Sequence, residues 1–110
     1  MLGASYSLIE AGVPLLNLNA EADALPRAWS SRVLERFGGG NFKVLRMDST
    51  PYPDEVHDHA EGLLVIDGEL CLRFAGEAVT VSRGELYFVP AGVPHSVDAG
   101  SVGSLVILDV

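Results

Sequence analysis

The chain contains three histidines, and their spacing is the feature best suited to chemistry. His57 and His59 are two residues apart. In a β-strand such residues point to the same face, with Cα atoms roughly 6.5 Å apart. His95 follows a run from Pro90 to Pro94 that is rich in proline and glycine and can fix a turn. If that turn returns the third imidazole to the first two, the three together can hold one transition metal ion.

The stretch that ends at His95 has a specific pattern. Gly84, Pro90, Gly92 and His95 match, without a gap, the second motif of the cupin family. That motif reads glycine, five residues, proline, one residue, glycine, two residues, histidine. An accidental match has a probability on the order of 10⁻³ or less in a chain this short, given average glycine and proline usage. This part of the sequence therefore resembles a cupin.

The first cupin motif is matched less completely. In the family, a glycine stands six residues before His-x-His, and a glutamate follows the second histidine after three or four residues. Here His57-x-His59 is present. Six residues separate Glu61 from Gly68, which is the distance between the glutamate and the next glycine in the family motif. Only one residue separates His59 from Glu61, however, and a proline occupies the first glycine position. The two motifs span residues 51–99, so the resemblance says little about the first forty residues.

The resemblance implies a metal site made of His57, His59, His95 and Glu61 that holds one divalent transition metal ion. Such ligands suit Fe, Mn, Ni, Zn, Co or Cu, and affinity order alone does not select among these metals. In an extended chain the Cα atom of Glu61 would lie roughly 13 Å from that of His57. A bend at Ala60-Glu61-Gly62 is therefore needed to bring the carboxylate inward. The alternatives are a solvated carboxylate at Glu61, an exposed histidine pair and a purely structural Pro/Gly loop.

Composition predicts one compact soluble domain. A chain of 110 residues lies in the usual single-domain range. The net charge of −8 opposes binding to nucleic acid and to anionic membranes. The single cysteine, Cys71, cannot form an internal disulfide, which favours a reducing, cytoplasmic setting. Neither a secretory signal nor an apolar run of about 20 residues is visible, so no membrane span is expected.

Short apolar runs separated by glycine-containing turns indicate strands from Trp29 onward. The residues from Asn19 to Leu25 predict one or two helical turns before Pro26. The expected strands cover residues 31–37, 42–48, 55–59, 63–66, 69–74, 78–81, 85–89, 95–98 and 104–109, with a loop at 49–54 and a turn at 67–68. A succession of short strands separated by turns is typical of a β-sandwich or β-barrel. The resemblance narrows it to an all-β, double-sheet jelly roll with a short N-terminal helical turn. Within that single domain, residues 1–40 are expected to form an N-terminal arm, the short helix and the first strand, and residues 41–110 the barrel.

Several other side chains are weaker candidates for the site. Four side chains could contact a ligand if they line the mouth of a pocket: Tyr52, Tyr87, Arg46 and Arg73. Packing between strands, or a charge at the rim, is the simpler role for them. Asp58 alternates away from the two neighbouring histidines, so it faces solvent or orients one of them. Cys71 is expected to be a small packed hydrophobe.

Two classes of function fit these features. The first is a small metal-dependent enzyme of the oxygenase, isomerase, decarboxylase or lyase type, acting on a small organic molecule. The second is a non-catalytic module of the same fold that binds or senses a small molecule or metal. A homodimer is also expected, from the family habit and from an apolar N-terminal segment that could cover its own barrel or pair with a partner's sheet edge. Its apolar residues are Leu8, Ile9, Val13, Leu15, Leu16 and Leu18.

Overall fold

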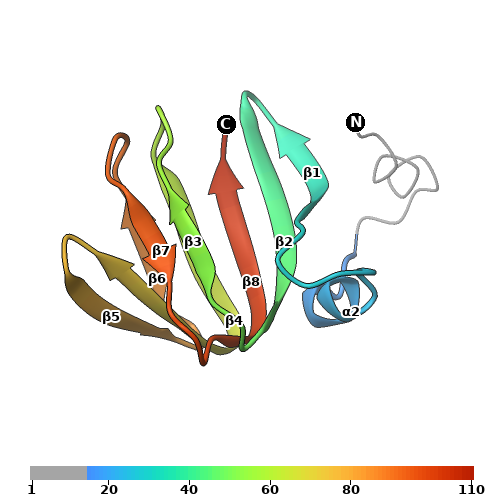
Figure 1. Cartoon of the computed structure of the whole chain (residues 1–110). Helices are drawn as coiled ribbons and strands as arrows, with labels where there is room; N and C mark the ends of the chain where they lie inside the picture. The colour runs from blue at the N-terminus through green and yellow to red at the C-terminus, as the bar shows by residue number, and fades with distance from the viewer. Residues whose placement is uncertain (1–14) are drawn as a thin grey trace.

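The computed structural model describes residues 15–110, and most of them belong to a strongly curled β-sheet (Figure 1). Within this range, one short helix, α2 (Leu18–Asp23), precedes eight strands. The strands are β1 (Arg32–Phe37), β2 (Gly40–Asp48), β3 (Tyr52–Glu55), β4 (Glu61–Phe74), β5 (Glu77–Ser82), β6 (Leu86–Val89), β7 (His95–Val97) and β8 (Val102–Asp109). The predicted all-β jelly roll with a short N-terminal helical turn is confirmed.

The long strand β4 joins the two layers of the barrel. Its N-terminal half pairs with β6 and β8, and β8 continues the layer to β2 and β1. The C-terminal half of β4 pairs with β5 and β7, and β7 continues the other layer to β3. All of these pairings are antiparallel. Figure 1 shows the result as a half-open barrel whose inner face is shared by strands from both layers.

The predicted turn at residues 67–68 is wrong, because β4 continues through these residues without interruption. Gly68 pairs with Gly103 of β8, and both have positive φ angles, +78° and +104°. A Cβ atom on Gly68 would lie 1.9 Å from the carbonyl oxygen of Val102, and one on Gly103 would lie 2.0 Å from that of Asp67. The two glycines therefore allow a close backbone approach at a β-bulge, where β4 bends from one layer into the other.

The predictions for residues 49–59 are also wrong in part. The expected loop contains β3, and the expected strand at 55–59 is a loop after Glu55. The prolines at positions 51 and 53 favoured a loop, because proline cannot donate a ladder hydrogen bond. Strand β3 pairs only with β7 within the described sheet, and an edge position of this kind tolerates proline.

Two of the predicted hairpins are confirmed. Strands β1 and β2 join through Gly38 and Gly39, as the glycine run indicates. Strands β4 and β5 join through Ala75 and Gly76, whose φ angles of +51° and +78° match the two-residue turns that suit a twisted hairpin.

Two hydrophobic clusters hold the sheet in shape. The larger lies between the layers and consists of Leu45, Met47, Leu63, Val65, Leu70, Leu72, Val81, Val89, Leu105 and Ile107. The smaller lies under α2 and consists of Ala22, Leu25, Leu34 and Val44. Asn17, rather than the expected Asn19, caps α2, since its side chain accepts a hydrogen bond from the Ala20 amide. Arg46 donates to the carbonyl oxygens of Ala22 and Leu25 at the other end of the helix.

Residues 1–14 of the predicted N-terminal arm, with Leu8, Ile9 and Val13, lie outside the described residues. The division of the chain at residue 40 stays a prediction. Within the described part, α2 and β1 both pack on β2. None of the helices in residues 15–110 is long and apolar enough to span a membrane.

Candidate metal centre

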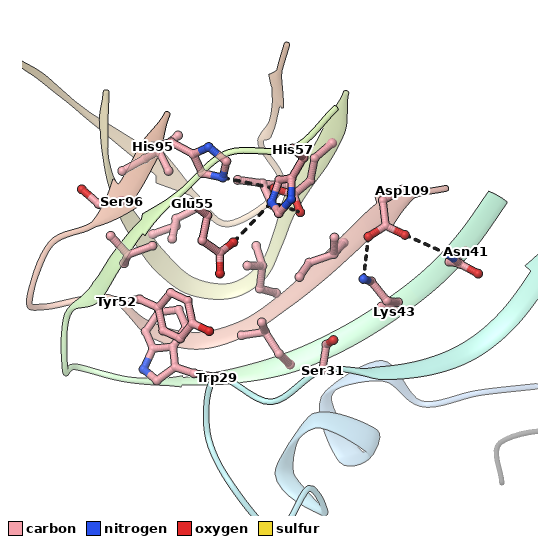
Figure 2. Close-up of a pocket in the computed structure, with 18 of the residues that line it drawn as sticks. Trp29, Ser31, Asn41, Lys43, Tyr52, Glu55, His57, His95, Ser96 and Asp109 are labelled. Carbon is pink, nitrogen blue, oxygen red and sulfur yellow. Dashed lines mark hydrogen bonds and ion pairs between the residues drawn. The ribbon is translucent and has the colours of Figure 1, made fainter. Parts of the chain in front are cut away.

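A pocket of about 460 Å³ opens on the inner face of the barrel and receives side chains from β2, β3, β4, β7 and β8. Its floor is apolar and consists of Leu45, Leu63, Leu70, Leu72, Leu105 and Ile107. The polar side chains stand on its walls (Figure 2). Such a volume, with an apolar floor and few polar groups, is typical of a site for a small molecule.

One wall of this pocket brings together Glu55, His57 and His95. Each offers one ligand atom, and these atoms lie within 4.8 Å of one another. Glu55 ends β3 and pairs in register with His95, the first residue of β7. His57 lies in the following loop, which is tied to the Pro/Gly loop because the amide of Gly92 donates to the carbonyl of His57 at 2.7 Å. The contact between the two loops thus holds His57 beside His95 at the start of β7.

Glu61 reaches the same wall. Its Oε1 lies 3.3 Å from Nε2 of His95, and its Oε2 lies 3.8 Å from Nε2 of His57. The residue is buried, with 8% of its surface exposed. The required change in direction occurs through bends at Asp58 and His59, so the chain is no longer extended when β4 begins at Glu61.

Hydrogen bonding shows which nitrogen of His95 faces the cluster. Nδ1 lies 3.0 Å from the carbonyl oxygen of Val93, which can only accept, so Nδ1 carries the proton. In a neutral imidazole, Nε2 then presents its lone pair to the carboxylate of Glu61. Two acceptors 3.3 Å apart repel each other unless a proton or a metal ion lies between them. The arrangement therefore calls for a cation.

The neighbouring imidazole gives an independent indication. Nε2 of His57 is buried without a hydrogen-bond partner and lies 3.3 Å from Oε1 of Glu55. An unpaired buried nitrogen is costly unless something not belonging to the chain completes it. Two imidazole nitrogens and two carboxylates form a suitable ligand set for a divalent transition metal. The backbone carbonyl that holds Nδ1 of His95 is the kind of partner that orients a metal-ligating histidine.

His59 takes a different position from the other two histidines. Its ring stacks on that of His57, with centroids 5.4 Å apart and an interplanar angle of 12°. Its Nδ1 lies 3.2 Å from the carbonyl oxygen of Ala60, and the side chain lines the pocket. It is not part of the group formed by Glu55, His57 and His95. Its role as a fourth ligand stays a prediction.

The weaker candidates separate into one pocket residue and several with a structural role. Tyr52 lines the pocket. Tyr87 packs against Phe74, with ring centroids 5.4 Å apart. Arg73 forms an ion pair with Asp98 at 2.9 Å. Arg46 donates a hydrogen bond to the carbonyl of Leu25 at the end of α2. Asp58 is exposed, and Cys71 is half-buried.

Among the pocket side chains that sequence reasoning did not identify are Glu55, Lys43, Trp29 and Asp109. Glu55 stands two residues before His57, which is a strand-like spacing that could have drawn attention to it. Lys43 shares the pocket face of β2 with Leu45, and the two-residue spacing typical of one strand face is present in the sequence. Trp29 and Asp109 come from segments whose nearness depends on the sheet pairing, and no sequence signal marks them.

Comparison with known proteins agrees with this geometry. The family model Cupin_2, described as a cupin domain, matches residues 47–110. A segment of 46 residues, or 41% of the chain, is 46% identical to quercetin 2,3-dioxygenase of Bacillus subtilis (strain 168). The match covers 14% of that protein, so the chain corresponds to a small part of this relative's length.

Solved structures resemble the chain over most of its length. A cupin-2 domain containing protein from Shewanella frigidimarina is 26% identical, with a TM-score of 0.78 over 86% of this chain and 92% of that one. Protein NMB1881 from Neisseria meningitidis is 25% identical, with a TM-score of 0.76 over 87% of this chain and 98% of that one. Together with the family match over more than half of its length, the barrel and its histidine wall show that this chain belongs to the cupin family.

Proposed function

We propose that the chain is a metal-dependent cupin enzyme that acts on a small organic molecule in the pocket. The observation that carries this proposal is the convergence of His57, His95, Glu55 and Glu61 on one wall of a cavity of about 460 Å³. A divalent metal bound there would supply Lewis-acid or oxygen chemistry at its open coordination positions. His59 is proposed as a further ligand. Because Cys71 is the single cysteine of the chain, a reducing, cytoplasmic setting is proposed as well.

The residues of the chain have distinct tasks in this proposal. His57 and His95 would hold the ion through Nε2, and the carboxylates of Glu61 and Glu55, which lie next to these nitrogens, would complete the ligand set. Val93 keeps the proton of His95 on Nδ1 and so keeps Nε2 available. The apolar floor excludes water from the reacting part of the ligand, and polar side chains on the other walls orient it.

The relative from Bacillus subtilis suggests the first substrate class to examine. Its name describes a quercetin 2,3-dioxygenase, and the shared segment supports oxygenase chemistry for this chain as well. The test is to purify the protein without chelator, measure its metal content, and follow oxygen consumption with quercetin and simpler phenols. A His95→Ala variant serves as the matched control.

Turnover that requires both metal and His95 would support the proposal. A protein without bound metal, even after incubation with Fe, Mn, Ni, Zn, Co and Cu, would overturn it. Metal binding with ligand binding but no turnover would favour the second function predicted from the sequence, a non-catalytic binding or sensor module.

A further inference from the structure

The wall of the pocket away from His57 and His95 carries the only lysine of the chain (Figure 2). Lys43 lies in β2, where Asn41, Lys43 and Leu45 all face the pocket. Its Nζ lies 2.5 Å from Oδ2 of Asp109 at the end of β8, and 21% of the lysine side chain is exposed. A charged group is thus presented to the pocket above a floor of leucine and isoleucine side chains.

Asp109 fixes the position of this ammonium group. Its side chain is 8% exposed, and its other oxygen accepts a hydrogen bond from Nδ2 of Asn41 at 3.0 Å. A lysine ammonium group has three N–H bonds. Asp109 is the one partner of Nζ within residues 15–110, so two N–H bonds are free to bind a ligand in the pocket. Because the carboxylate is held from both sides, the lysine is oriented before any ligand arrives.

A third wall of the pocket is aromatic and rigidly held. The rings of Trp29 and Tyr52 lie 5.7 Å apart at an angle of 31°, and both line the pocket. The indole Nε1 donates to Oδ1 of Asp48 at 2.8 Å and to Oγ1 of Thr50 at 3.1 Å. Trp29 also has a φ angle of +62°, which is strained for a bulky residue and is kept only where surrounding contacts hold it.

We propose that the pocket takes a small organic acid with a flat ring, and that Lys43 is the residue that selects for its carboxylate. The free N–H bonds of Lys43 bind the carboxylate, and the ring packs against Trp29 and Tyr52 above the apolar floor. The acid group is directed to Lys43 because no other lysine or arginine is among the described residues that line the pocket. This inference rests on the proposed function, since it names the substrate class of the same pocket.

Trp29 provides the measurement, because it is the only tryptophan of the chain and lines the pocket. Its fluorescence is followed while benzoate, its neutral analogue benzamide, or the non-planar cyclohexanecarboxylate is added to the purified protein, up to about 10 mM. We expect benzoate to bind about tenfold more tightly than benzamide, as befits a hydrogen bond between charged groups. Cyclohexanecarboxylate should bind more weakly than benzoate, because it lacks a flat face.

Variants identify the residue responsible. Lys43→Met should remove the preference for benzoate over benzamide, and Lys43→Arg should keep it. Arg83→Gln makes the same change in net charge at an exposed site and should leave both affinities unchanged. Because Lys43→Met leaves a buried carboxylate unpaired, the double variant Lys43→Met with Asp109→Asn is measured as well.

Three outcomes would overturn the inference. They are equal binding of benzoate and benzamide by the native protein, absence of any response up to about 10 mM, and a preference that persists in the folded double variant. Metal content is measured in every sample, and the titrations are repeated after chelation. A preference that depends on Lys43 in a protein that binds no metal would refute the proposed function while supporting this inference.

Discussion

Nε2 of His95 lies 3.3 Å from Oε1 of Glu61, and both groups are buried. The imidazole is held in this orientation by the carbonyl of Val93, and the backbone of Glu61 is placed by the start of β4. An ion between them would therefore be held by atoms already in place, which lowers the cost of ordering a site on binding.

The first prediction concerns the histidines. His57→Ala and His95→Ala should each reduce a metal content close to one ion per chain to a small fraction, because each removes a nitrogen ligand. His59→Ala should also reduce it if His59 is a ligand, as the resemblance to cupins implies. The measurement is elemental analysis after purification without chelator. Asp58→Asn, at an exposed position in the same loop, is the control, and unchanged occupancy in both His57→Ala and His95→Ala would contradict the metal site.

The second prediction separates the two glutamates. Glu61→Gln should weaken metal binding by about tenfold or more, because an anionic ligand is lost while the volume is kept. Glu55→Gln should have a smaller effect, since the Glu55 side chain is 38% exposed and that of Glu61 is 9% exposed. Competition with a chromophoric chelator measures both affinities. An affinity of Glu61→Gln within about twofold of the native value would show that Glu61 is not a ligand.

The third prediction concerns stability in acid. Burial raises the pKa of Asp109, but the hydrogen bonds from Lys43 and Asn41 outweigh this effect and hold the pKa below its ordinary value of 3.8. A pKa lowered by folding means that the ionised carboxylate stabilises the fold above pH 3.8, and that this contribution is lost as the pH falls through the folded-state pKa.

Asp109→Asn should accordingly lower the free energy of unfolding at neutral pH by about 1–3 kcal/mol. The difference from the native protein should shrink as the pH falls below 3.8. Urea denaturation at a series of pH values measures it. A difference that stayed constant down to the lowest pH would mean that the ionised Asp109 carboxylate does not contribute.

The fourth prediction tests the bend in β4. Gly68→Ala and Gly103→Ala should each lower the free energy of unfolding by about 3 kcal/mol or more, because the new methyl group would meet backbone atoms at about 2 Å. Gly76→Ala is the matched control, since Gly76 also has a φ of +78° but nothing lies within 4 Å of its Cβ position. It should cost only about 1–2 kcal/mol for the backbone angle. Equal losses in all three variants would exclude the close approach as the cause.

The fifth prediction is the homodimer that the sequence indicates. Sedimentation at micromolar concentration should show a species of twice the chain mass. Exposed apolar residues on the described surface, among them Leu86 at 44% and Phe88 at 61% exposure, support an association of this kind. Phe88→Ser should weaken it. A native protein that sediments as a monomer would favour an N-terminal segment that covers its own barrel.

The sequence predicted most of the fold because its turn signals are local. Glycine pairs and alternating apolar residues predicted the hairpins β1–β2 and β4–β5 correctly. The sequence predicts a turn at Gly68 where the structure has a bend, because glycine with a positive φ occurs in both, and only the pairing with Gly103 distinguishes them.

The site was predictable to the extent that its residues lie in motifs. The spacing predicted a role for His57 and His95, and the resemblance to cupins implied one for Glu61; the structure brings these three side chains together. Lys43 and Asp109 are far apart in sequence and meet because β2 and β8 are neighbours in the sheet. A pairing between distant strands is set by the whole core, so no local pattern could indicate this contact.

The central position of β8 has a consequence for how the chain is made. Strand β8 follows every other described strand in the sequence, yet it lies between β2 and β4. The strands synthesised before it cannot complete their layer, or close the pocket with Asp109, until residues 102–109 have left the ribosome. Contacts between such distant segments also slow folding. During synthesis the facing edges of β2 and β4 therefore remain unpaired, and this is the stage at which a chaperone would protect the chain most.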